Sequence, residues 1–204
     1  MPALVRILPI YKQLPERSKG SIVVTTVAKA SQEWCKLSPF LLGPCKLYDG
    51  HISKNMENAW QYSKVYREHL EPGPARLPGP KYFKWAKEGW MNPKAVRYPF
   101  CKPKKPEYSW WDGEKFGYVD ARKKIYGPLY SEKVIETQAF KNLQRLHDTS
   151  KELILLDYDA YDHHELGMDL SDVLNNPDRK MGHAFVLAML LTEDPALDEM
   201  ELRI

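Results

Sequence analysis

The chain has little cysteine, and it lacks the motifs of several large enzyme classes. Only three of its 204 residues are cysteines, and Cys35, Cys45 and Cys101 do not have the spacing of a metal site. An odd number of scattered cysteines argues against a disulfide framework, so we expect a reducing, intracellular (cytoplasmic) setting. No GxGxxG, P-loop or GxSxG motif occurs, so triphosphate chemistry and the hydrolase triad have no support in the sequence.

Long hydrophobic runs are also missing. No stretch reaches the roughly 18 apolar residues of a membrane-spanning helix, and residues 1–6 do not resemble a signal peptide. We therefore expect no membrane partner. The 30 Lys and Arg nearly balance the 27 Asp and Glu, and 43% of the residues are hydrophobic. These values indicate a folded domain rather than a disordered chain.

The pattern of side chains predicts mixed α and β structure with helix in the majority. Residues 21–30 and 152–156 are rich in the branched apolar side chains of strands, and 45–49 predicts a further short strand. Prolines and glycines exclude regular structure from residues 71–80. Helices are expected over 55–64, 81–90, 117–126, 131–146, 169–175 and 181–191.

Residues 55–64 carry an unusual polar stripe. On a helix, Glu57, Gln61 and Lys64 stand at i, i+4 and i+7 on one face, with Trp60 on the same side. The stripe is either a solvated face with an ion pair or the lining of a pocket. In a pocket, an amine among apolar groups has a lowered pKa and can attack an anomeric carbon. A neighbouring carboxylate can protonate a departing base or activate water.

A cluster of acids and histidines follows the strand expected over residues 152–156. Its members are Asp157, Asp159, Asp162, His163 and His164. Their oxygen and nitrogen atoms could bind a metal ion, but neither an EF-hand nor an HExxH pattern is present. The alternative is a polar loop with Tyr158 and Tyr161 packed inward, and we expect neither metal nor cofactor.

Residues 71–106 combine basic and aromatic side chains. Nine are Lys or Arg and only two are acidic. The interleaved rings are Tyr82, Phe83, Trp85, Trp90, Tyr98 and Phe100. This composition is typical of a surface that contacts phosphates and bases, with Lys102, Lys104 and Lys105 as candidate nucleic-acid contacts. The alternative is a solvated loop above a small aromatic cluster.

Several stretches together resemble the NADAR family, the YbiA-like N-glycosidases. Its opening is similar to Leu37-Ser38-Pro39-Phe40, Leu47-Tyr48-Asp49-Gly50 and Glu57-x-Ala59-Trp60-Gln61-x-x-Lys64. Residues 122–126, 133–146, 152–162 and 181–190 resemble its later elements in the same order. The chain departs from the family pattern at Asn58, where a His is usual, and at Asp157, where a Glu is common.

The resemblance implies an α+β, helix-rich single domain with a small number of short strands. That domain would span residues 37–191 and include the insertion 71–106, between an N-terminal extension (1–36) with a strand and an acidic, frayed tail (192–204). The implied reaction is cleavage of an N-ribosyl bond in an ADP-ribosylated base, free or in nucleic acid, or in a related ribosyl nucleotide. A non-enzymatic nucleotide or nucleic-acid binding protein on the same scaffold is the alternative.

The resemblance also implies roles for individual residues. Lys64 would be the covalent or electrostatic catalyst and Glu57 the acid/base, while Asp157 or Asp162 would hold ribose hydroxyls. The implied substrate-binding residues are Phe40, Asn58, Trp60, Gln61 and Arg122.

Overall fold

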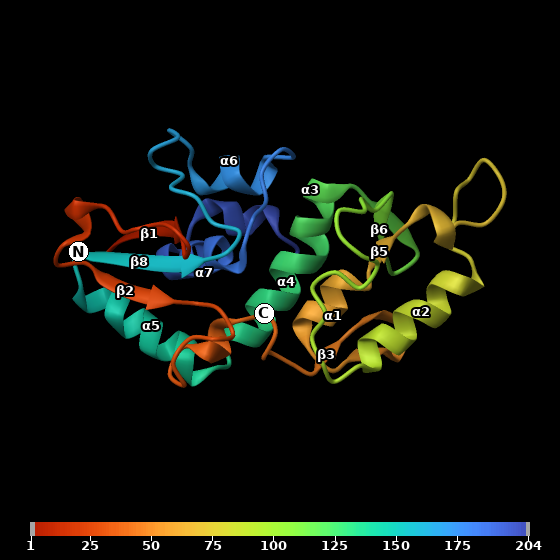
Figure 1. Cartoon of the computed structure of the whole chain (residues 1–204), viewed down its shortest axis with the longest axis horizontal. Coiled ribbons are helices and arrows are strands. Elements are labelled where there is room, and N and C mark those ends of the chain that lie inside the picture. Colours follow the sequence, from red (N-terminus) through yellow and green to blue (C-terminus); the bar gives the residue numbers. More distant parts are fainter. Residues whose placement is uncertain (1–2, 203–204) are drawn as a thin grey trace.

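The computed structural model describes residues 3–202, apart from the Arg17 side chain, as an elongated α+β molecule (Figure 1). Its strands are short, and helices predominate, as predicted. The helices are α1 (Met56–Gln61), α2 (Pro80–Met91), α3 (Tyr118–Ala121), α4 (Gly127–Val134), α5 (Gln138–Thr149), α6 (Leu170–Asn175) and α7 (His183–Thr192). No helix among the described residues is both long and apolar enough to cross a membrane.

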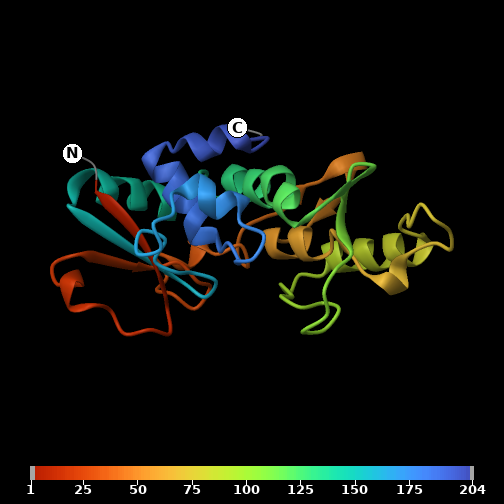
Figure 2. The same cartoon turned by 90° about the horizontal axis from the view of Figure 1, so that it is seen from above.

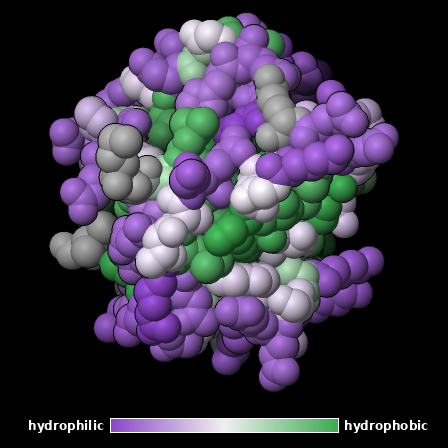
Figure 3. All heavy atoms as spheres, turned by 90° about the vertical axis from the view of Figure 1, so that its left-hand side faces the viewer, coloured by the Kyte–Doolittle hydropathy of each residue, from purple (hydrophilic) through white to green (hydrophobic). Residues whose placement is uncertain are grey.

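A parallel sheet forms one end of the molecule. Strand β8 (Glu152–Asp157) lies between β1 (Leu4–Pro9) and β2 (Ile22–Thr25). Alternate side chains of these strands, among them Ile7 and Leu155, enter the hydrophobic core. Figure 2 shows α5 and α7 on one side of this sheet and the segment that joins β1 to β2 on the other. Seen from the sheet end, the surface has apolar side chains gathered among hydrophilic ones (Figure 3).

Two small antiparallel sheets lie toward the other end of the molecule. Strand β3 (Cys45–Lys46) pairs with β4 (Ile52–Ser53), and β5 (Lys64–Val65) pairs with β6 (Tyr108–Trp111), which also pairs with β7 (Glu114–Phe116). The turn between β6 and β7 is Asp112-Gly113, both with positive φ. Asp-Gly is a common hairpin turn, although the sequence analysis did not identify this hairpin.

The described parts of both end segments pack into the fold, although the sequence analysis placed them outside the domain 37–191. Strands β1 and β2 supply two of the three strands of the parallel sheet, so the described part of residues 1–36 does not lie outside the domain. The expectation of a frayed tail is also wrong, since Met200 is buried and Glu199 pairs with Lys123 at 2.7 Å. Residues 1–2 and 203–204 of these two segments lie outside the described part.

The single helix expected over residues 131–146 is instead two helices, α4 and α5. The break falls at residues 135–137, where Thr137 has extended backbone angles and its side chain accepts a hydrogen bond from the Phe140 amide at 3.1 Å. Threonine is a good N-cap because its hydroxyl satisfies one of the free amides of the first turn. The apolar periodicity runs across this break, which is why the pattern predicted one helix.

Candidate active site

A cavity of about 430 Å³ opens at the carboxyl edge of the parallel sheet, where the two ends of the molecule meet. Residues 27–29 after β2, 157–159 at the end of β8 and 180–183 at the start of α7 form one side. Helix α1 and Arg97 with Tyr98 form the other side. Crevices at the carboxyl ends of parallel strands commonly bind ligands, because the loops there can carry varied side chains above a rigid sheet.

Glu57, Gln61 and Lys64 lie in this cavity as a hydrogen-bonded chain. Gln61 Nε2 donates to Glu57 Oε1 at 2.9 Å, and Lys64 Nζ donates to Gln61 Oε1 at 2.7 Å. The prediction that all three share one helix is wrong for Lys64, because α1 ends at Gln61 and Lys64 begins β5. The Ser63 hydroxyl donates to the Trp60 carbonyl at this helix end, and the long lysine side chain still returns to the cavity.

Burial determines the charge properties of this chain. It raises the pKa of Glu57, although the hydrogen bond from Gln61 and the charge of Lys64 oppose the shift. Burial lowers the pKa of Lys64 to about 8, against the attraction of Glu57. The site therefore provides an amine that loses its proton more readily than an ordinary lysine. It also provides a carboxyl group that retains its proton more strongly than an ordinary glutamate.

An aromatic surface lies beside the amine. Lys64 Nζ is 4.7 Å from the centre of the Trp60 ring, and Trp60 packs against Tyr126 with ring centres 5.2 Å apart. Tyr126 ends a π-helical turn, Arg122–Tyr126, between α3 and α4. Such turns are rare and are often found at functional sites.

Asp157 ends β8 and faces the first turn of α7. Its Oδ2 lies 3.1 Å from His183 Nδ1 and 3.4 Å from the Ala184 amide nitrogen. His183 Nε2 lies 2.9 Å from the Thr26 carbonyl oxygen, so both ring nitrogens of this buried histidine face oxygen atoms. A side chain at Gly182 would overlap the Asp157 carboxylate, and glycine is therefore required for this close approach.

Arg97 lines the cavity, and the sequence analysis did not name it as a site residue; the same is true of Lys29, Tyr118, Tyr126, Lys180 and His183. Arg97 Nη2 donates to Asp159 Oδ2 at 2.6 Å, and Lys180 Nζ lies 3.5 Å from Asp159 Oδ1. The sequence counted Arg97 only as one of nine basic residues in the stretch 71–106. The sequence signal that could have identified Arg97 is its position next to Tyr98, since a basic and an aromatic residue side by side can form one binding surface. Both side chains line the cavity.

Asn58 has a supporting role and does not line the cavity, contrary to the expected substrate contact. Its Nδ2 donates to the carbonyl oxygens of Asn92 at 3.0 Å and Lys94 at 2.9 Å. Its Oδ1 accepts from the Val96 amide at 2.8 Å. The side chain thus fixes the backbone immediately before Arg97.

Phe40 and Arg122 both line the cavity, as expected of substrate contacts. Arg122 is buried, and its guanidinium lies 4.2 Å from the centre of the Tyr118 ring. It donates to the carbonyl oxygens of Val173, Leu174, Asn176 and Arg179. Arg122 therefore anchors the end of α6 and the segment leading to Lys180.

Asp162 does not join the cavity. It forms a buried ion pair with Arg6 of β1, which also lies 3.5 Å from Glu152. Across residues 3–202, no group of three or more His, Cys, Asp or Glu side chains is arranged to hold a metal ion. The acids of the cluster instead pair with Arg6, Arg97 and His183.

The stretch 71–106 uses most of its aromatic rings for packing. Of the six interleaved rings only Tyr98 is exposed, while Tyr82 and Trp90 are fully buried. Phe100 stacks on Tyr66 with ring centres 4.5 Å apart. Lys102, Lys104 and Lys105 are exposed outside the cavity, and Lys104 pairs with Glu68. These rings therefore provide little stacking surface for bases.

The charges of the cavity favour an anionic ligand, and its aromatic side chains favour a ligand with flat rings. Its basic residues are Lys29, Lys64, Arg97, Arg122 and Lys180, against the acids Glu57, Asp157 and Asp159. Its aromatic residues are Phe40, Trp60, Tyr98, Tyr118, Tyr126 and Tyr158. Cations bind phosphate oxygens, and aromatic faces stack on bases.

No family model, no curated protein and no solved structure matches the chain.

Proposed function

We propose that the protein is an N-glycosidase that cleaves an N-ribosyl bond of an ADP-ribosylated base or a related ribosyl nucleotide. The observation that carries the proposal is the chain Glu57–Gln61–Lys64 in a cavity that also holds aromatic rings and an excess of cations. The resemblance of residues 37–64 to NADAR proteins supports the same reaction, and the chain is proposed to be a remote relative of that family.

The reaction needs an attacking group and an acid, and this pair supplies both. Uncharged Lys64 attacks C1 of the ribose, the bond from C1 to the base nitrogen breaks, and Glu57 donates a proton to that nitrogen. The ribose ring of the adduct then opens to a protonated imine, C1=Nζ, as the oxygen of the opened ring takes a proton from Nζ. Water adds to C1, the bond between C1 and Nζ breaks, and the proton lost by the water returns to the Glu57 carboxylate, which restores both the amine and the acid. A Lys64 that keeps its charge would act only as an electrostatic group. Asp157 lines the same cavity and is proposed to hold ribose hydroxyls, as the resemblance implies.

Incubation with ADP-ribosylated DNA, NAD and ADP-ribose, followed by mass spectrometry of the products, tests the activity. We expect release of a free base from at least one N-ribosyl substrate. Lys64→Ala should lower the rate about 10³-fold or more, and Lys64→Arg should do the same if the amine is the nucleophile. Lys141→Ala, on the exposed surface of α5, is the matched control and should retain full activity.

Borohydride reduction separates the two roles of Lys64. With wild-type protein and substrate it should trap a ribose adduct on Lys64, identified by peptide mass spectrometry. Activity lost in Lys64→Ala without a trapped adduct would indicate the electrostatic role. Full activity in Lys64→Ala would refute any catalytic role. Tight binding of the nucleotides by wild-type protein without turnover would favour the alternative, a nucleotide-binding protein on the same scaffold.

A further inference from the structure

A second cavity lies next to the first and has no place in the proposed chemistry. It measures about 490 Å³ and is lined by residues 8–9 at the end of β1, by residues 11–15 after it and by residues 158–162 after β8. Glu165, Leu166, Arg179 and Lys180 complete the lining. The cavity therefore also opens at the carboxyl edge of the parallel sheet, where ligands bind in sheets of this kind. Figure 2 shows the segment between β1 and β2 on the side of the sheet opposite α5 and α7.

The two cavities share one wall. Tyr158, Asp159 and Lys180 line both of them. The shared residues belong to the segment after the central strand and to the segment before α7. Lys180 keeps 60% of its side chain exposed, and its Nζ lies 3.5 Å from Asp159. A cation that lines both cavities can bind a negatively charged group of a ligand that occupies both.

The second cavity offers aromatic and basic side chains to a ligand. Tyr11 is 69% exposed and Tyr158 is 45% exposed, although both line a cavity. The Arg179 guanidinium lies 5.1 Å from the centre of the Tyr161 ring. Exposed tyrosine faces and arginine planes bind bases by stacking and cation–π contacts. Lys12, Arg179 and Lys180 provide positive charge along the same walls.

The acids of this cavity do not offset that charge fully, because two of the three pair with cations from outside its lining. Asp162 pairs with buried Arg6 and Asp159 pairs with Arg97, which leaves Glu165 against Lys12, Arg179 and Lys180. A flat ring and a negatively charged linker are therefore the groups that these walls would bind.

We propose that the second cavity binds the distal nucleoside of an extended ligand whose ribosyl carbon lies beside Lys64. The ligand class is two ring systems joined by a pyrophosphate-like linker, which passes Lys180 at the shared wall. This assignment rests on the proposed function for the identity of the proximal ribose. One wall of the distal site consists of residues 8–9 and 11–15, and so the site depends on the segment before the NADAR-like stretch.

Calorimetric titration with ADP-ribose and with ribose 5-phosphate tests the proposal without requiring turnover. Wild-type protein should bind ADP-ribose about tenfold or more tightly than ribose 5-phosphate, because only ADP-ribose reaches the second cavity. Tyr11→Ala and Arg179→Ala should each reduce this ratio severalfold. Both side chains are exposed, so their removal leaves the core intact.

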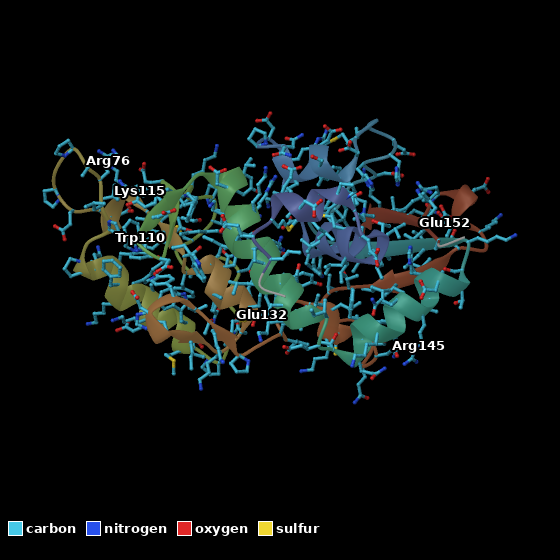
Figure 4. The ribbon with its side chains drawn as sticks, turned by 180° about the vertical axis from the view of Figure 1, so that it is seen from behind. Arg76, Trp110, Lys115, Glu132, Arg145 and Glu152 are labelled. Carbon is cyan, nitrogen blue, oxygen red and sulfur yellow. The ribbon has the colours of Figure 1, made fainter. Side chains whose placement is uncertain are left out.

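Two control variants complete the design. Tyr11→Phe keeps the ring and should keep the ratio. Arg145→Ala removes an exposed arginine on the outer side of α5 (Figure 4) and should leave both affinities unchanged. Equal affinities for the two probes in wild-type protein, no binding of either probe, or an unchanged ratio in both Tyr11→Ala and Arg179→Ala would overturn the proposal.

The outcomes also separate this proposal from the proposed function. A ratio that falls in the two variants, in a protein that cleaves no N-ribosyl substrate, would support the second site and contradict the catalytic role. Cleavage of a mononucleotide substrate together with equal affinities for both probes would support the catalytic role and overturn the second site.

Discussion

At the scale of single residues, the sequence predicted that Glu57, Gln61 and Lys64 lie together, but part of its reason was wrong. The length of the lysine side chain, and not a shared helix face, brings Lys64 to the other two residues. Glu57 and Gln61 do share a helix face, as their spacing requires. Lys64 lies beyond the helix, but its four-carbon stem places Nζ back at Gln61. The spacing could not show that Asp162 pairs with Arg6, because these residues are 156 positions apart in the sequence.

Lys64 should lose its proton at a lower pH than an ordinary lysine. Burial lowers its pKa to about 8, so its reaction with an amine-selective reagent should increase with pH through a midpoint near this value. Glu57 opposes the shift, and Glu57→Gln should therefore move the midpoint to lower pH. Peptide mass spectrometry of the labelled protein over a pH series measures both midpoints.

Exposed Lys141 is the internal control for the access of the reagent to a surface amine. A Lys64 midpoint at the ordinary lysine value of about 10.4 would show that the amine is solvated, and the catalytic role would lose its main support. A midpoint that moves upward in Glu57→Gln would show that the carboxyl group does not stabilise the ammonium ion.

At the scale of elements, α1 contributes to the cavity in two ways. Its Glu57 and Gln61 line the cavity, while Asn58 turns away and holds the backbone of residues 92–96. That backbone leads directly to Arg97, which lies in the long loop between α2 and β6. A short helix can thus fix both a catalytic group and a distant cation, because its successive side chains point in different directions.

Asn58→Ala should therefore affect stability and the site together. It removes hydrogen bonds to three backbone groups of residues 92–96, and a loss of about 1–3 kcal/mol in the free energy of unfolding is expected. Urea unfolding measures this loss. Affinity for ADP-ribose should fall as well, because Arg97 loses its support. Asn142→Ala on α5, whose side chain makes only exposed hydrogen bonds, should change stability by less than about 0.5 kcal/mol.

Unchanged ADP-ribose affinity in a destabilised Asn58→Ala variant would show that Arg97 keeps its position without this support. Unchanged stability would show that water replaces the asparagine at the three backbone groups without cost.

At the scale of the whole molecule, local pattern predicted most elements but not how the chain brings them together. The strand over 152–156, the helix over 81–90 and the helix over 169–175 all have clear periodicity and ends, and the structure contains them. Strand β1 was missed because a charged residue, Arg6, interrupts its apolar run. Parallel pairing of β1 with β8 joins residues almost 150 positions apart, and no short-range signal reports it.

The first 36 residues should be needed for the whole molecule to fold. A chain that begins at residue 37 should fail to fold cooperatively, because β8 would lose its hydrogen-bonding partners on both edges. It would also lose the buried side chains of β1, among them Val5 and Ile7, each worth about 1.5–3 kcal/mol. Such losses approach the whole stability of a typical domain, about 5–15 kcal/mol.

Circular dichroism and thermal unfolding of the two chain lengths measure the effect of this truncation. The control replaces residues 72–76 with two glycines, at the exposed loop tip that carries Arg76 (Figure 4). The amide of Glu71 already bonds to the carbonyl of Leu77 at 2.9 Å, so the shorter turn should leave the unfolding midpoint within a few degrees of wild type. A truncated chain with the same cooperative transition as the full protein would show that residues 37–204 are an independent domain. In that case the first 36 residues would be the appendage that the sequence predicted, although the first cavity would still lose the wall formed by residues 27–29.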